Sequence, residues 1–241
     1  INIKAPENIN LQGEGKISVE TTGQGNAGTI DIQTQNLNLS EQIKITASTE
    51  AEGKGGDINI SPKETTLNIT GNGEISASTS GAGQGGNIEL KATETIDITG
   101  DGEISVKTTG AGDAGEISIE TPNLTTDKIE ITASTEAEGK GGAITAKTDT
   151  LSLDNNSQLT VEANSSGDAG DIKIETGSLT VENGAQISAQ TKASGDGGNI
   201  NISGPEKLKI TGDGEISART SGAGQGGNID ISAPETTLNI T

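Results

Sequence analysis

The sequence predicts an all-β protein, a right-handed parallel β-helix in which residues 1–241 form a single β-solenoid repeat domain. We expect about 28 residues per coil, three short strands per coil, and eight coils plus a partial ninth. Three observations predict this fold. A glycine-rich phrase recurs at a nearly constant interval, a branched apolar residue lies at a fixed distance before each copy, and apolar and hydroxyl residues alternate strictly from that residue onward. An internal period of this size is typical of solenoids.

The glycine-rich phrase, Gly-x-(Ala/Gly)-Gly-x-Ile, occurs eight times, with successive copies 27 to 30 residues apart. Its fourth position supplies the turn glycines, which are Gly28, Gly56, Gly86, Gly115, Gly142, Gly170, Gly198 and Gly227. Each coil is taken to begin at the isoleucine of a phrase, and the first coil at Ile1. The nine coils, numbered 1 to 9, therefore start near residues 1, 30, 58, 88, 117, 144, 172, 200 and 229.

A branched apolar residue lies 13 residues before the isoleucine of every phrase. In each case the next residue is Ser or Thr and the one after it is Val or Ala. This apolar, hydroxyl, apolar alternation is typical of a half-buried strand. We predict one buried core column formed by Ile17, Ile45, Ile75, Ile104, Ile131, Leu159, Ile187 and Ile216.

Coil 2 illustrates the three strands, which we expect to begin near Ile30, Leu37 and Ile43. Burying one Ile or Leu side chain gives roughly 1.5–3 kcal/mol, whereas ordering the backbone of one residue costs about 1–2 kcal/mol. A lone coil therefore does not fold. Stacked coils bury one another's isoleucines and share backbone hydrogen bonds, so stability builds up along one axis. Parallel crossover connections are overwhelmingly right-handed, which predicts the hand.

The composition excludes several classes of partner. The chain has 35 acidic and 15 basic residues, a single arginine (Arg219) and no aromatic residue, so we expect no nucleic-acid binding. An anionic membrane surface would repel the chain, and no apolar run is long enough for membrane insertion. The 36 glycines and the net charge of −20 point toward disorder. The strict apolar alternation rejects that interpretation.

Two copies of the stretch SGAGQGGNI match the G-x-G-x-x-G pattern of dinucleotide-binding loops, at Gly81, Gly83 and Gly86 and at Gly222, Gly224 and Gly227. A dinucleotide site requires a helix after the loop. Here the strand-like stretches NIEL and NIDI follow, and related loops recur in every coil. We therefore expect no nucleotide and no other cofactor. We interpret the glycines as positions of positive φ and of tight packing between stacked turns.

Asp168, Asp171 and Asp196 lie on neighbouring glycine loops and are weak candidates for a cation site. Lys140 and Gln225 occupy the same column in the adjacent coils. A solvated acidic edge is therefore the favoured interpretation, and no metal site is expected.

A threonine column also follows the third strands and is interrupted only by Ala163. We expect its hydroxyls to close the third strand through hydrogen bonds to neighbouring groups. The members are Thr21, Thr49, Thr79, Thr108, Thr135, Thr191 and Thr220. An ice-binding face would need two flat, adjacent columns of hydroxyl groups. The residue directly before each of these threonines is charged in some coils and polar in others, so the sequence does not predict such a face.

Catalysis is the main competing class, because pectin-degrading enzymes share the β-helix architecture. Their chemistry needs clustered carboxylates with a basic partner, or calcium with an Arg or Lys base. This chain has no histidine, one arginine, and acidic residues spread along the repeats. We therefore expect that it is not an enzyme.

Residues 179–203, LTVENGAQISAQTKASGDGGNINIS, strongly resemble the repeats of filamentous-haemagglutinin-like exoproteins of two-partner secretion systems, above all the large cyanobacterial members. The resemblance covers the whole chain, since the other coils carry variants such as GEISASTSGAGQGGNIEL. It implies a secreted right-handed β-helix that is exported through an outer-membrane transporter and acts at the cell surface as a stalk or adhesin.

Together these observations predict a structural shaft of an extracellular filament or surface adhesin, secreted or on the outer cell surface. The alternative is a module that binds glycans or a cell surface along one solenoid face. An exposed groove with irregular polar residues would favour binding, and uniform faces would favour the shaft. We expect the partners to be further copies or repeats of the chain end to end, because open solenoid ends expose unpaired backbone groups. Cell-surface glycans are the second candidate partner.

Overall fold

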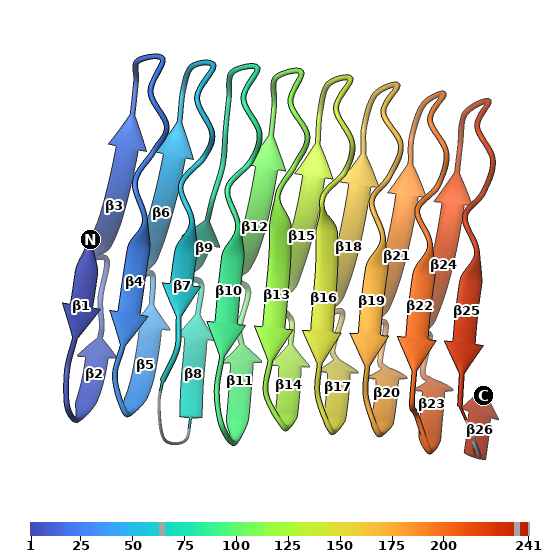
Figure 1. Cartoon of the computed structure of the whole chain (residues 1–241). Coiled ribbons are helices and arrows are strands. Elements are labelled where there is room, and N and C mark those ends of the chain that lie inside the picture. The colour runs from blue at the N-terminus through green and yellow to red at the C-terminus, as the bar shows by residue number, and fades with distance from the viewer. Residues whose placement is uncertain (63–65, 234–236, 241) are drawn as a thin grey trace.

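A computed structural model describes residues 1–62, 66–233 and 237–240 and confirms the solenoid. Strands β1 to β26 follow one another coil after coil, and every described element is a strand (Figure 1). Accordingly, the described residues hold no helix that could cross a membrane. Each complete coil contributes one strand to each of three parallel sheets, called sheets A, B and C in chain order.

Sheet A contains the first strand of each coil: β1 (Asn2–Lys4), β4 (Ile30–Gln33), β7 (Ile58–Ile60), β10 (Ile88–Lys91), β13 (Glu116–Glu120), β16 (Ala143–Lys147), β19 (Ile172–Glu175), β22 (Ile200–Ser203) and β25 (Ile229–Ser232). Sheet B contains the second: β2 (Asn8–Leu11), β5 (Asn36–Glu41), β8 (Thr66–Gly71), β11 (Thr95–Thr99), β14 (Asn123–Asp127), β17 (Thr150–Asp154), β20 (Ser178–Glu182), β23 (Lys207–Thr211) and β26 (Thr237–Ile240). Sheet C contains the third: β3 (Lys16–Thr21), β6 (Lys44–Thr49), β9 (Glu74–Ser76), β12 (Glu103–Thr108), β15 (Glu130–Thr135), β18 (Gln158–Ala163), β21 (Gln186–Thr191) and β24 (Glu215–Thr220).

The strands pair in the register that the repeat predicts. In sheet A, Ile30 lies opposite Ile58, and Ile58 lies opposite Ile88. In sheet C the eight residues of the predicted core column pair in sequence, from Ile17 with Ile45 to Ile187 with Ile216. The six interior members are buried, whereas Ile17 and Ile216, in coils 1 and 8, are half-buried.

The core is built from aliphatic side chains, apart from Thr126, which takes the inward position between Ile98 and Leu153 in sheet B. In coil 2 all seven apolar residues that alternate along the three strands are buried: Ile30, Ile32, Leu37, Leu39, Ile43, Ile45 and Ala47. The outward positions between them are partly or fully exposed, except in sheet C, where the central Thr46 is also buried. A chain with few apolar residues thus builds a continuous core because nearly all of them point inward.

The structure corrects one part of the interpretation of the turn glycines: none of the eight has a positive φ. Positive φ values occur at other glycines, such as Gly71 and Gly100 between the second and third strands. The turn glycines are instead required by close approach. A Cβ added at any of the last seven would lie 1.7–2.0 Å from the carbonyl oxygen of the turn glycine one coil before.

Gly28, the first turn glycine, differs because the structure describes no coil stacked on its N-terminal side. A Cβ added there would meet only Val19, at an ordinary contact distance of 3.8 Å. The steric demand for glycine therefore comes from the coil stacked on the N-terminal side, and not from the conformation of the loop.

We expect Gly56→Ala to destabilise the fold by about 3 kcal/mol or more, because its Cβ would lie 2.0 Å from Gly28 O and the backbone would have to separate. Gly28→Ala, one coil away, should change stability by no more than about 0.5 kcal/mol. Urea unfolding followed by circular dichroism compares the two. Equal destabilisation by both variants would contradict the stacking explanation.

Candidate functional site

The glycine loops are not open cradles. The stretch Gly81–Gly83–Gly86 is followed by β10, and a Cβ at Gly83 would lie 2.0 Å from Gly53 O, so the loop packs directly on the loop before it. Its backbone amides are also in use, since Gly85 N donates to Asp113 O at 2.8 Å. The second match, at Gly222, Gly224 and Gly227, leads into β25. Neither loop presents free amides at a helix N-terminus for a phosphate.

The aspartates of the loops act as backbone acceptors. Asp168 Oδ1 accepts the amide of Asp196 at 2.9 Å, and Asp196 Oδ1 in turn accepts the amide of Gln225 at 2.7 Å. Asp171 Oδ1 accepts the amide of Asn199 at 2.7 Å. Each carboxylate thus bonds the equivalent residue of the following coil instead of converging on a shared point. Among the described residues, no group of three or more Asp or Glu side chains is placed to hold a metal ion.

Asparagine supports the same ladder without charge. Asn26 Oδ1 accepts the amide of Lys54 at 2.8 Å, and Asn87 Oδ1 accepts the amide of Glu116 at 3.0 Å. A short side chain with an acceptor oxygen therefore accepts a hydrogen bond from a loop amide that has no partner in the strand pairing. This structural role accounts for the clustering of Asp and Asn at the loops.

The threonine column ties each glycine loop to the strand before it. Thr49, Thr79, Thr108 and Thr191 donate their hydroxyl protons to the carbonyl five residues on, at 2.8–3.1 Å. Two of these hydroxyls also accept an amide from the preceding coil: Ala27 N donates to Thr49 and Ala169 N to Thr191. Two members differ: Thr220 donates to Gly195 O at 3.2 Å, and the buried Oγ1 of Thr135 has no hydrogen-bond partner in the described structure.

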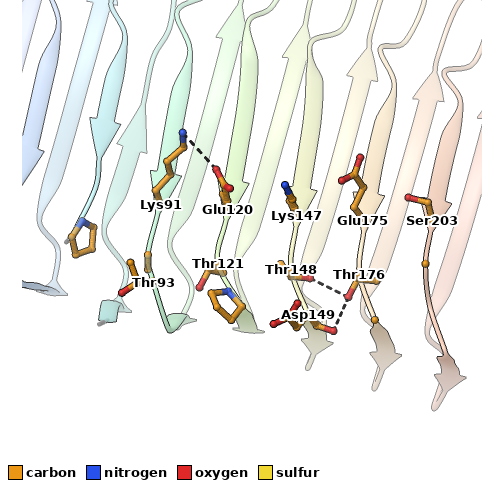
Figure 2. A pocket seen from close by; sticks show the side chains of 15 residues that line it. Lys91, Thr93, Glu120, Thr121, Lys147, Thr148, Asp149, Glu175, Thr176 and Ser203 are labelled. Atoms are coloured by element: carbon orange, nitrogen blue, oxygen red, sulfur yellow. Dashed lines mark hydrogen bonds and ion pairs between the residues drawn. The ribbon is translucent and has the colours of Figure 1, made fainter. Parts of the chain in front are cut away.

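A groove of about 820 Å³ runs along the corner where sheet A passes into sheet B (Figure 2). This corner groove is lined by Pro62 and by residues 91–93, 120–122, 147–149, 175–177 and 203–204, so it crosses coils 3 to 8. Lys91, Glu120, Lys147, Glu175 and Ser203 form one row with one residue per strand (Figure 2). The next residue in coils 5 to 7 is a threonine, and Thr121, Thr148 and Thr176 form a second row beside the first.

The lengths of the corners account for the groove. From the first isoleucine of sheet A to the first apolar residue of sheet B there are seven residues in coil 5 (Ile117 to Leu124), and coils 6 and 7 have the same length. Coil 4 and coil 8 need eight, as in Ile200 to Leu208. A corner with one residue fewer is tighter, and the shorter corners of coils 5 to 7 form the middle of the groove, which continues onto the longer corners of coils 4 and 8.

The row of charged side chains alternates in sign. Lys91 Nζ lies 2.9 Å from Glu89 and 3.5 Å from Glu120. The hydrogen bond and ion pair with Glu89 raise the pKa of Lys91, and those with Lys173 lower the pKa of Glu175. Both groups are therefore charged at neutral pH. Lys147 is exposed between Glu120 and Glu175 and makes no ion pair within the described residues.

The polar groups on the floor of the groove already have hydrogen-bond partners within the protein. The buried hydroxyl of Thr148 donates to Thr176 Oγ1 at 3.0 Å, and Thr176 donates onward to Ser178 O at 3.0 Å. Backbone amides of the corner donate to the next or the preceding coil, for example Thr148 N to Glu175 O at 2.8 Å and Gly177 N to Asp149 O at 3.0 Å. The groups left for a ligand are therefore the exposed side chains of the rim.

The sequence analysis missed this groove, because its signal is a one-residue difference in corner length that has meaning only once the coils are stacked. The fold and the corner groove together define a β-solenoid repeat protein with a groove that runs along its axis. Comparison with family models, with characterised proteins and with solved structures finds no match to the chain.

Removing the acceptor of the loop ladder should weaken the fold. Asp171→Ala leaves the amide of Asn199 without its side-chain acceptor, and we expect a loss of about 1 kcal/mol. Asp171→Asn keeps the acceptor oxygen, as Asn87 does in the same column, and should be close to neutral. Urea midpoints of the two variants provide the measurement. A larger loss from Asn than from Ala would contradict the acceptor role.

The threonine column offers a matched pair of isosteric changes. Thr191→Val removes the hydroxyl that bonds Asp196 O and should cost about 1 kcal/mol. Thr135→Val removes a buried hydroxyl that has no partner, so stability should stay equal or rise by up to about 1 kcal/mol. Thermal and urea unfolding of both variants tests this prediction. If Thr135→Val lost as much stability as Thr191→Val, the hydrogen bond from Thr191 to Asp196 O would make no contribution of its own.

Proposed function

We propose that this chain is a non-catalytic segment of the shaft of an extracellular filament or surface adhesin. The supporting observation is the uninterrupted register of the three parallel sheets, through nine coils in sheets A and B and through eight in sheet C, which gives stability and growth in one direction only. A shaft needs length and a continuous core, and the core columns supply both. The resemblance of the repeats to filamentous-haemagglutinin-like exoproteins is the basis for placing the shaft outside the cell.

The ninth coil exposes apolar side chains that the inner coils bury. Ile229 and Ile231 are each 43% exposed, whereas their register partners Ile200 and Ile202 are 0% and 1% exposed. Ile240 in β26 is 64% exposed. A second copy of the chain that stacks on this face would bury these side chains in the same way, and we propose that copies associate by this contact. Such a head-to-tail contact does not close and therefore produces a rod.

A second role, glycan binding along one face, is favoured by one observation. The faces of the solenoid are not uniform, because the corner groove carries irregular polar and charged residues over several adjacent coils. A shaft and a binding face are compatible in one molecule, since the groove involves only the outer corner.

The shaft proposal predicts self-association of the purified chain through its ends. We expect sedimentation that depends on protein concentration and rods in electron micrographs. Replacing Ile229 and Ile231 by threonine should reduce this association, because the exposed apolar area of the end is lost while β-forming residues remain.

Asp230→Asn is the matched control, because Asp230 lies between the two isoleucines and points to the outer face of the same strand. This variant should associate like the unmodified chain. A concentration-independent monomer whose end strands are protected from amide exchange would contradict the proposal, since the ends would then need no cover.

A further inference from the structure

We propose that the corner groove binds an extended, uncharged glycan chain that lies parallel to the solenoid axis. This inference rests on the second role considered above, the glycan-binding face, and does not depend on the shaft. The groove crosses six coils, from Pro62 in coil 3 to Gly204 in coil 8. At ~4.8 Å per strand the recessed surface extends over roughly 24 Å, which suits a linear polymer and not a compact ligand.

The available hydrogen-bonding groups point to hydroxyls as the ligand chemistry. The corner amides already bond neighbouring coils, so an extended peptide would find no backbone partners there. The rim instead presents ammonium donors and carboxylate acceptors in turn, at Lys91, Glu120, Lys147 and Glu175. A sugar hydroxyl both donates and accepts, so a chain of sugar units can satisfy either kind of group at successive rungs.

The charge balance selects an uncharged glycan. Three carboxylates, those of Glu120, Asp149 and Glu175, line the groove together with the ammonium groups of Lys91 and Lys147. The whole chain carries a net charge of −20. Uronic-acid or sulfated polymers would be repelled by this field. A neutral chain has no such penalty and can use Lys147, which has no competing ion pair among the described residues.

The test is a titration of the whole chain with cellohexaose and with chitohexaose, followed by amide nitrogen–proton NMR spectra. We expect saturable shifts at residues 91–93, 120–122, 147–149 and 175–177, and no saturation with the monomers glucose and N-acetylglucosamine. Lys147→Ala should weaken the binding about tenfold, the loss expected for one hydrogen bond to a charged group. Lys147→Gln, which keeps a donor, should recover part of it.

Lys44→Ala is the matched control. Lys44 is an exposed lysine of sheet C, away from the groove, and its removal should leave binding unchanged. The proposal is overturned if neither hexasaccharide binds saturably, if the shifts fall outside the groove, if Lys147→Ala binds as well as the unmodified chain, or if oligogalacturonate binds more tightly than both. Failure of the shaft would appear separately, in the sedimentation of the chain without glycan.

Discussion

In-register contact between the backbones of successive coils is the constraint on which the rest of the structure depends. Parallel strands stack at ~4.8 Å, and the loops that join sheet C to sheet A must stack at the same spacing. At that spacing a side chain at the turn position would collide with the carbonyl one coil before, as at Gly142 and Gly115. The turn glycines, the loop ladders of Asp and Asn, and the aliphatic columns are separate consequences of that spacing.

The spacing of about 4.8 Å between coils also determines which charged side chains lie next to one another on the acidic surface. Residues at one position of successive coils are direct neighbours, so like charges in one column destabilise and opposite charges stabilise. Lysine and glutamate face each other at Lys44–Glu74 and at Lys91–Glu120. On sheet B an uncharged amide ladder replaces the pairs, with Asn38 donating to Asn10 and Asn68 donating to Asn38. The compensation is partial, because Glu74, Glu103 and Glu130 lie in register on sheet C, and each exposed pair contributes little by itself.

The sequence was sufficient to predict the coil period, the three strands and the core columns, since all of them follow from apolar alternation repeated at a constant interval. It was not sufficient to predict why glycine is required. A glycine can supply positive φ or close approach, and only the position of the neighbouring coil separates the two, as the contrast between Gly28 and Gly56 shows. Asp168 and Asp196 were ambiguous for the same reason, because the amides they accept belong to the next coil.

The distribution of constant and variable segments explains how the solenoid keeps a constant core while its outer surface varies. From the core column of sheet C to the next isoleucine of sheet A there are 13 residues in every coil, because this segment contains the stacked glycine loop. The corner between sheets A and B varies by one or two residues without disturbing the register on either side, as Ile96 opposite Leu124 and Leu179 opposite Leu208 show. A change of corner length therefore reshapes the outer surface while the core columns stay aligned. Recognition can be placed at the corners of such a solenoid at little cost to the stacking that holds it together.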